Sequence, residues 1–194
     1  MNLINDIEEI LVTNDQIVER CEQLGKQIAM DYAGKKPIII GLLRGAVPFM
    51  AELIKHIDEQ LEIDFLDASS YDGTHSTGKV IIRRDILSDI KDRDVLFVED
   101  IVDTGLTLSE IKKEYLKRNP KSMEVVTLLD KKEGRLIDDF KPKYVGFNIP
   151  KKFVVGFGLD YNEFYRNLPY IGVLKRSVYE KWKRRIYEIW KKRF

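Results

Sequence analysis

Three carboxylates, Glu99, Asp100 and Asp103, lie within five residues of one another at the end of an apolar run. Carboxylates this close repel one another, and some would have raised pKa values, unless cations or hydrogen-bond donors occupy the space between them. Residues 104–107 follow directly and read Thr-Gly-Leu-Thr. The backbone N–H groups of such a turn, at the start of a helix, form a row of donors suited to a phosphate. The segment therefore predicts a site for a phosphorylated sugar.

The apolar residues 95–98, Val-Leu-Phe-Val, must position these groups. A short continuous run of β-branched and aromatic residues is typical of a strand that is covered on both faces of a parallel sheet. Ligands of open α/β sheets bind in the crevice at the carboxyl ends of the strands. The acids follow the strand at that end, which is where a ligand site is expected.

Strands and helices alternate along the rest of the chain. Thr13 and Gln16 form a capping-box pattern ahead of a helix that ends near Gly34, and further helices are predicted at 47–57 and 107–117. Strands are predicted at 37–43, 61–69, 79–84, 95–99, 122–129, 144–147 and 153–156. This alternation predicts an α/β fold with a mostly parallel central sheet flanked by helices.

Composition sets few limits on function. The chain has 194 residues, a formal net charge of +1 and no apolar run near the roughly 20 residues that span a bilayer, so we expect one compact cytoplasmic domain. Cys21 is the only cysteine, which excludes a disulfide within the chain. His56 and His75 lack metal-ligand spacing to another His or Cys, which argues against a zinc site.

The stretch 95–108, VLFVEDIVDTGLTL, resembles the phosphoribosyl-pyrophosphate signature of the type I phosphoribosyltransferases. The plain alternative is a strand that ends in solvated acids before a capped turn. The resemblance implies that Glu99 and Asp100 hold the ribose hydroxyls, directly or through metal-bound water, and that Asp103 is the general acid/base at N7 of a purine. It also implies that backbone and hydroxyl groups hold the 5-phosphate, from Asp103, Thr104, Gly105, Leu106 and Thr107. Some relatives have a lysine in place of Leu106.

Arg44 and Gly45 close an earlier predicted strand and resemble the family's pyrophosphate-binding loop. The alternative for Arg44 is an ordinary solvated position, since most arginines are exposed. In the family, the peptide bond that matches Leu43–Arg44 tends to be cis. The resemblance adds Arg166 to the groups that hold the pyrophosphate.

The resemblance implies Mg²⁺ as the cofactor. Asp160 would complete a second magnesium site with the pyrophosphate leaving group, because hard oxygen ligands together with phosphates suit this ion. The implied metal ligands are Glu99, Asp100 and Asp160.

Ser70 and Tyr71 open a polar, glycine-punctuated segment between two predicted strands. Such a segment is usually only a connection, with His75 exposed. The Ser-Tyr pair resembles the flexible lid that closes over the transition state in purine phosphoribosyltransferases. Closure of such a lid excludes water from an electrophilic ribosyl centre.

Lys131 and the segment 152–161 resemble the nucleobase pocket of hypoxanthine-guanine phosphoribosyltransferases. Phe153 can stack on a purine, with Ile101 a candidate for its other face. Lys131 is a pure donor and can hydrogen-bond the oxygen at C6 of hypoxanthine or guanine, whereas adenine would present a second donor there. The alternative for Phe153 is an aromatic residue of the core, and the alternative for Lys131 is an ordinary surface lysine. The predicted purine-binding set is Lys131, Phe153, Val154, Ile101 and Asp160.

The resemblance covers residues 10–179 and implies a purine-salvage enzyme. Such an enzyme transfers the 5-phosphoribosyl group from phosphoribosyl pyrophosphate to N9 of a 6-oxopurine, hypoxanthine and also guanine, which gives IMP or GMP and pyrophosphate. Residues 1–179 would form this domain, with a small hood made by the N-terminal and 145–175 segments. The competing hypotheses are a transferase for xanthine or a pyrimidine, and a nucleotide-sensing regulator that binds nucleic acid.

Residues 180–194 are predicted to form a basic amphipathic helix. The part 181–194 carries seven basic residues and one acid. One helical stripe contains Trp182, Ile186, Ile189 and Trp190. Contact with its own domain or a partner subunit is the favoured interpretation, and an anionic membrane surface or nucleic acid is the alternative. The resemblance implies a homodimer or homotetramer.

Overall fold

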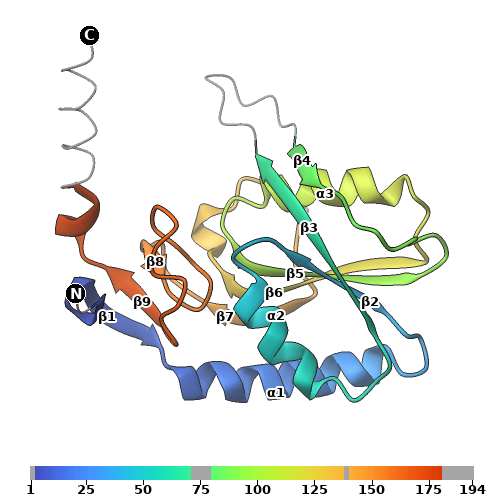
Figure 1. Ribbon diagram of the computed structural model, residues 1–194, viewed down its shortest axis with the longest axis horizontal. Coiled ribbons are helices and arrows are strands. Elements are labelled where there is room, and N and C mark those ends of the chain that lie inside the picture. Colours follow the sequence, from blue (N-terminus) through green and yellow to red (C-terminus); the bar gives the residue numbers. More distant parts are fainter. Residues whose placement is uncertain (1–2, 71–79, 138–139, 181–194) are drawn as a thin grey trace, which may run out of the picture.

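The computed structural model describes residues 3–70, 80–137 and 140–180, and a six-stranded sheet forms its centre (Figure 1). The strands stand in the order β4-β3-β2-β5-β6-β7, and all neighbours are parallel except β3 and β4. Their bounds are β2 Ile38–Leu42, β3 Glu62–Ser70, β4 Val80–Arg84, β5 Asp94–Val102, β6 Ser122–Asp130 and β7 Tyr144–Asn148. The predicted α/β fold with a mostly parallel sheet is confirmed.

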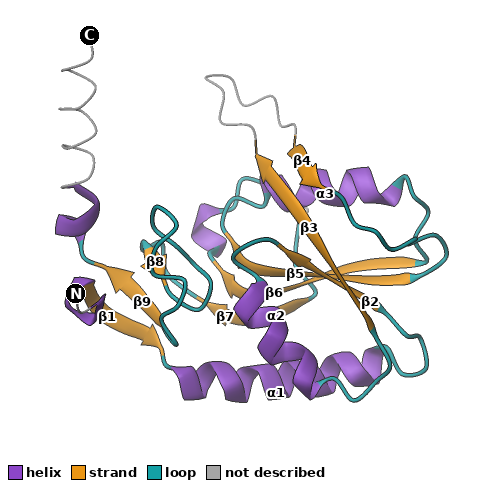
Figure 2. Ribbon diagram, in the orientation of Figure 1, coloured by secondary structure: helices purple, strands orange, loops and turns teal. Residues whose placement is uncertain are grey.

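Helices cover both faces of this sheet (Figure 2). They are α1 Asn14–Asp31, α2 Val47–Leu53 and α3 Leu106–Leu116, with the short 3-10 turns η1 Leu3–Asp6, η2 Ile54–His56 and η3 Lys132–Gly134. The helices α1 and α2 share one buried cluster with Ile39 of β2, whereas α3 shares another with Ile38 and Ile40. Successive residues of a strand point to opposite faces, so the continuous apolar run of β2 serves both clusters. Among the described helices, none has the length and apolar character needed to cross a membrane.

A three-stranded antiparallel sheet brings together residues from near both ends of the described chain. Its order is β1-β9-β8, with the bounds β1 Ile7–Val12, β8 Val154–Val155 and β9 Ile171–Leu174. It has its own apolar cluster around Ile7, Val155 and Leu174. This sheet is the expected hood. It meets the main sheet where Gly158 packs on the carbonyl of Gly45, just after β2.

The hood is also where the predicted elements and the structure differ most. The strands β1 and β9 are absent from the predicted set. β1 reads Ile-Glu-Glu-Ile-Leu-Val without strict alternation, and its pairing with β9 contains two register shifts. The strand predicted at 153–156 is shorter than expected, because Gly156 turns the chain with a φ of 100°. These strands depend on partners far away in the sequence, and local patterns do not reveal such partners.

Candidate active site

The predicted acids lie on and just after β5, at the carboxyl edge of the main sheet. β5 runs past its predicted end at Glu99, because Val102 still pairs with Asp130 of β6. Lys131 follows β6 directly, and its N–H donates to the carbonyl of Val102 at 2.9 Å. The register of these two central strands therefore brings Lys131 to the acids.

The turn after β5 lines a cavity of about 150 Å³ at the start of α3. Gly105 precedes α3 with a φ of 80°, a left-handed conformation that glycine adopts without steric cost. The lining residues are Glu99, Ile101, Val102, Asp103, Thr104, Gly105, Thr107 and Leu108. Leu106 is the one residue of the predicted phosphate set outside this lining, and its side chain is exposed. The other four residues line a cavity at the start of a helix, where the first N–H groups are free to donate hydrogen bonds to a bound phosphate.

Asp103, which lines this cavity, also lies close to Lys131. Asp103 Oδ2 lies 3.7 Å from Lys131 Nζ, and the Lys131 side chain is 11% exposed against 50% for Asp103. Gly134 makes the arrangement possible, because a Cβ there would lie 2.1 Å from Asp103 Oδ1. A half-exposed carboxylate beside a buried cation is well placed to exchange a proton with a ligand that covers both.

Glu99 and Asp100 form the inner, half-buried end of the site. Burial raises the pKa of Glu99 well above its usual range, and the neighbouring Asp100 carboxylate raises it further. Burial also raises the pKa of Asp100 to about 6, although the N–H of Ile101 donates to this carboxylate at 2.7 Å. Gly45 packs closely against it, and a Cβ there would lie 1.6 Å from Asp100 Oδ2.

A divalent cation fits this carboxylate pair. Glu99 Oε2 is buried and has no hydrogen-bond partner among the described residues. Two neighbouring carboxylates with little contact with water are unfavourable as anions, and a cation stabilises their charged forms. No three His, Cys, Asp or Glu side chains gather at one point in the described part of the chain. The further ligands of a hard ion held here would therefore be water and phosphate or ribose oxygens.

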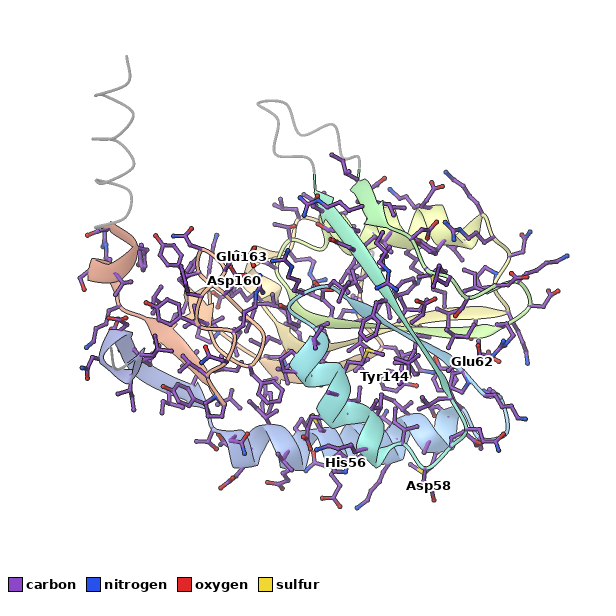
Figure 3. The ribbon with its side chains drawn as sticks, in the orientation of Figure 1. His56, Asp58, Glu62, Tyr144, Asp160 and Glu163 are labelled. Atoms are coloured by element: carbon purple, nitrogen blue, oxygen red, sulfur yellow. The ribbon has the colours of Figure 1, made fainter. Side chains whose placement is uncertain are left out.

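The predicted pyrophosphate residues Arg44 and Arg166 are joined by Glu163. Glu163 Oε2 accepts a hydrogen bond from Arg44 at 2.8 Å and from Arg166 at 3.2 Å. The bond from Arg166 holds the pKa of Glu163 below its usual range. Arg166 also pairs with Asp160 Oδ1 at 2.8 Å, and Figure 3 shows Asp160 and Glu163 on the loop region that follows β8. Glu163 is missing from the predicted site, and no local pattern marks it, because the segment is a loop without helical spacing.

Close backbone contact holds this loop against the turn after β2 that contains Arg44 and Gly45. The Leu43–Arg44 peptide bond is cis, in agreement with the tendency of the family that the sequence resembles. Gly158 has a φ of 101°, and a Cβ on it would lie 1.9 Å from the carbonyl oxygen of Gly45. Arg166 donates to the carbonyl of Gly158 at 2.7 Å. The hood therefore supplies one cation and the main sheet supplies the other.

Phe153 stands at the hood side with 44% of its surface exposed. Its ring packs edge-on against Tyr161, with centroids 5.7 Å apart, and at a tilt against Tyr179, with centroids 5.5 Å apart. The side chain of Val154 is buried, which leaves only its backbone for a ligand. Ile101 packs against the same apolar cluster as Val154. An exposed ring supported from behind is suited to stacking on a flat base.

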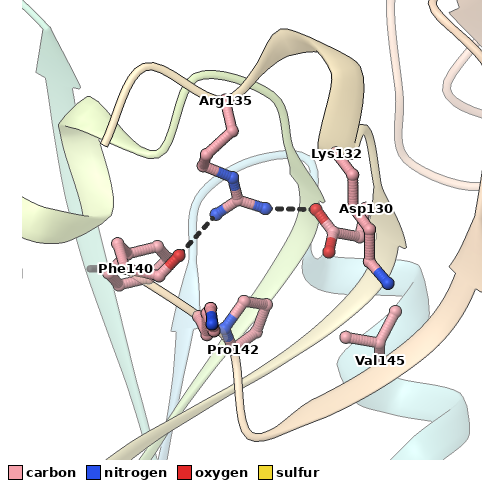
Figure 4. A pocket seen from close by; sticks show the side chains of 7 residues that line it. Asp130, Lys132, Arg135, Phe140, Pro142 and Val145 are labelled. Carbon is pink, nitrogen blue, oxygen red and sulfur yellow. Dashed lines mark hydrogen bonds and ion pairs between the residues drawn. The ribbon is translucent and has the colours of Figure 1, made fainter. Parts of the chain in front are cut away.

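A larger cavity of about 470 Å³ lies beside the phosphate turn (Figure 4). Arg135 forms a buried ion pair with Asp130 and donates to the carbonyl of Phe140 at 3.1 Å. The N–H of Leu136 donates to the carbonyl of Thr104 at 3.1 Å. The segment that contains η3 and Leu136 thus supports the turn at residues 104–107.

Two predicted features lie outside the described residues. Ser70 ends β3, but its side chain is not described, and Tyr71 with the rest of the predicted lid lies in the undescribed range 71–79. The basic segment 181–194 also lies outside. Both remain predictions.

Known proteins resemble this chain in sequence and in fold. The sequence-family model of the phosphoribosyl transferase domain matches residues 8–162 of this chain. A hypoxanthine-guanine phosphoribosyltransferase from Streptococcus pneumoniae is 54% identical over 178 residues, covering 91% of this chain and 98% of the relative. The structure of a hypoxanthine phosphoribosyltransferase from Staphylococcus aureus aligns with a TM-score of 0.88 at 51% identity, covering 91% of this chain and 96% of the other.

A more distant structure bears on the C-terminus. A hypoxanthine phosphoribosyl transferase from Trypanosoma cruzi, whose C-terminal region was studied for its role in oligomeric state and enzymatic activity, aligns with a TM-score of 0.87. It is 39% identical, and the match covers 91% of this chain and 96% of the other.

Proposed function

The chain belongs to the phosphoribosyl transferase family and is a hypoxanthine-guanine phosphoribosyltransferase of purine salvage, and we propose how its residues divide that reaction. The observation that carries the proposal is the proximity of Asp103 and Lys131, 3.7 Å apart, where Asp103 lines the cavity at the turn 104–107. A base bound over this pair meets a donor and a proton acceptor side by side.

Phosphoribosyl pyrophosphate binds by its two charged ends. The 5-phosphate occupies the turn 104–107, where backbone N–H groups and the hydroxyls of Thr104 and Thr107 donate to it. Arg44 and Arg166 hold the pyrophosphate between the main sheet and the hood. Arg166 Nε is buried without a hydrogen-bond partner among the described residues, so this guanidinium keeps one unsatisfied donor.

The purine lies between Phe153 and the acid cluster. Lys131 donates to the oxygen at C6, which selects 6-oxopurines because adenine carries an amino group there. N9 of the base forms a bond to C1′ of the ribose as the bond from C1′ to the pyrophosphate oxygen breaks. Asp103 accepts the proton that leaves N7, and the positive charge of Lys131 lies beside the accepting carboxylate.

In this proposal Glu99 and Asp100 would hold Mg²⁺ near the ribose, and Asp160 would contribute to a second ion near the pyrophosphate. Bound Mg²⁺ neutralises charge on the leaving group. Glu99 and Asp100 also place negative charge near the ribose, which stabilises positive charge that develops on the ring.

The substitution Asp103→Asn tests the central step, since it keeps the shape and removes the proton acceptor. We expect kcat with hypoxanthine to fall by about 10²- to 10⁴-fold, the usual contribution of general acid/base catalysis, while the KM for phosphoribosyl pyrophosphate stays within a few-fold. Asp58→Asn, at an exposed position outside the site, is the matched control. Retention of wild-type kcat in Asp103→Asn would remove Asp103 from the proton transfer.

A base panel tests the preference for 6-oxopurines. The wild-type protein is incubated with phosphoribosyl pyrophosphate, Mg²⁺ and hypoxanthine, guanine, xanthine or adenine separately, and nucleotide formation is measured. We expect turnover of hypoxanthine and guanine and little of adenine. Equal rates with adenine would contradict the role of Lys131.

We also propose that the protein assembles as a homodimer or homotetramer. The relative from Trypanosoma cruzi, in which the C-terminal region was examined together with oligomeric state, supports a link between the C-terminus and assembly. Light scattering coupled to size-exclusion chromatography measures the mass directly, and a monomer at micromolar concentration would contradict the proposal.

A further inference from the structure

The ring of Phe153 is held by two aromatic residues that come from later in the chain. Tyr161 lies at a centroid distance of 5.7 Å with an interplanar angle of 87°, and Tyr179 lies at 5.5 Å with an angle of 39°. Phe153 nevertheless keeps 44% of its surface exposed. Tyr161 therefore contacts Phe153 edge-on and Tyr179 contacts it at a tilt, while part of the Phe153 ring stays exposed.

The backbone of Phe153 is tied to the same C-terminal segment. Its carbonyl accepts from the N–H of Leu174 at 3.0 Å, at the end of β9. Residues 176–180 then form a helical turn, coloured red in Figure 1, that carries Tyr179 back over the ring. One short stretch of chain thus fixes both the backbone and the side chain of Phe153.

The turn that carries Tyr179 is itself anchored in the hood. The N–H of Lys175 donates to the carbonyl of Asp6 at 2.9 Å, and the N–H of Val178 donates to the carbonyl of Lys175 at 2.9 Å. The hydroxyl of Tyr161 donates to the carbonyl of Tyr179 at 3.4 Å. Tyr179 is therefore placed by backbone contacts, and its ring meets Phe153 in a defined position.

We propose that Tyr179 is a positioning residue for the purine base, which acts by holding the ring of Phe153 in its stacking orientation. The inference rests on the proposed stacking role of Phe153. Tyr179 lies beyond residue 162, where the match to the family domain ends, so the domain pattern does not include it. A ring fixed before binding loses less side-chain freedom when the base arrives, which strengthens base binding.

The expected effect is confined to the base. Ordering one additional side chain when the base binds corresponds to a change of about 2- to 12-fold in affinity. Tyr179→Ala should therefore raise the KM for hypoxanthine within that range, while the KM for phosphoribosyl pyrophosphate stays unchanged. Tyr179→Phe should behave as the wild type, because the ring makes the contact with Phe153 and only the backbone carbonyl of Tyr179 takes part in the bond from Tyr161.

The test is made in the full-length chain. The two KM values, kcat and the melting temperature are measured for wild type, Tyr179→Ala, Tyr179→Phe and Tyr179→Leu. Tyr179→Leu keeps an apolar side chain but removes the planar ring. It replaces Tyr179→Ala in the test if the alanine variant does not fold. A rise in the hypoxanthine KM alone, rescued by phenylalanine, supports the proposal. An unchanged hypoxanthine KM in both Tyr179→Ala and Tyr179→Leu overturns it, as does an equal rise of both KM values.

Phe153→Ala separates this inference from the function on which it rests. If Phe153→Ala leaves the hypoxanthine KM unchanged, the stacking role of Phe153 is wrong, and the inference falls with it. If Phe153→Ala raises that KM and the Tyr179 variants do not, the stacking role stands and the inference about Tyr179 alone is wrong.

Discussion

The carboxyl edge of the main sheet and the hood hold their parts of the site by different means. At the edge, Glu99 and Asp100 are carried by a central strand, and Gly45 packs directly on the Asp100 carboxylate. In the hood, Phe153 and Arg166 depend on short strands, ring contacts and partly exposed ion pairs.

Because of this difference, the two regions should tolerate amino-acid substitutions to different degrees. Close packing at the sheet edge leaves no room for an extra atom, because protein interiors are already densely packed. Exposed ion pairs in the hood contribute little stability each and can rearrange. We expect substitutions at the edge to abolish function and substitutions in the hood to tune it.

Gly45→Ala should have the largest effect on the use of phosphoribosyl pyrophosphate. A Cβ at this position would lie 1.6 Å from Asp100 Oδ2, so the loop or the carboxylate must move. We expect kcat/KM for phosphoribosyl pyrophosphate to fall by about 100-fold, since displacements of about 1 Å at a reacting site cost that much. Gly34→Ala is the control, because a Cβ there meets nothing within 4 Å and only its φ of 71° opposes the change. Equal losses in both variants would point to general backbone strain.

Lys131→Ala should follow. It removes the buried donor proposed for the purine, and a hydrogen bond from a charged group contributes about 1.5–3 kcal/mol, or about 10- to 150-fold in the KM for hypoxanthine. The preference for hypoxanthine over adenine should shrink with it. Lys132→Ala, at the exposed neighbouring lysine, is the matched control. A loss confined to phosphoribosyl pyrophosphate would assign Lys131 to the sugar instead.

Stability without Mg²⁺ should depend on pH through the buried acids. The pKa of Asp100 is raised to about 6 and that of Glu99 is raised further from its usual range, so the folded protein binds more protons than the unfolded chain above about pH 4. The stability contributed by these two groups is greatest at low pH and falls as pH rises through their folded-state pKa values. We expect the melting temperature to drop by several degrees between pH 5 and pH 8.

Glu99→Gln isolates the contribution of Glu99 to that drop. The amide stays neutral, so the melting temperature should fall less with pH than in the wild type. Glu8→Gln, at an exposed position in β1, should leave the wild-type pH dependence intact. Identical pH curves for Glu99→Gln and wild type would mean that Glu99 is already satisfied in the folded protein.

Glu163→Gln should have the smallest effect and the opposite sign. Glu163 occupies both arginines that we assign to the pyrophosphate, and the ligand must displace it. Exposed ion pairs are weak, so the KM for phosphoribosyl pyrophosphate should fall by only about twofold. Glu133→Gln, at another exposed carboxylate, is the control. A higher KM would show that Glu163 orients the arginines for the ligand, and the contrast between edge and hood would weaken.

The residues that local patterns predict best lie on the main sheet. The apolar run of β5, the acids that end it and the turn 104–107 are contiguous, so their chemistry is visible in the sequence. The capping box predicted at Thr13 and Gln16 is present, with both of its hydrogen bonds formed. Contiguous features of this kind depend on neighbours along the chain and need no knowledge of the fold.

Tertiary structure decided the rest of the site. The contact of Lys131 with Asp103 follows from the register of β5 and β6, and Glu163 reaches Arg44 only because the hood loop packs on the turn after β2. Tyr179 reaches Phe153 only because β9 pairs with β8. Sequence by itself determined which groups could bind phosphate, because a strand, its turn and its helix are neighbours in the chain. Which groups meet across the site was set by long-range strand pairing, whose partners no local pattern identifies.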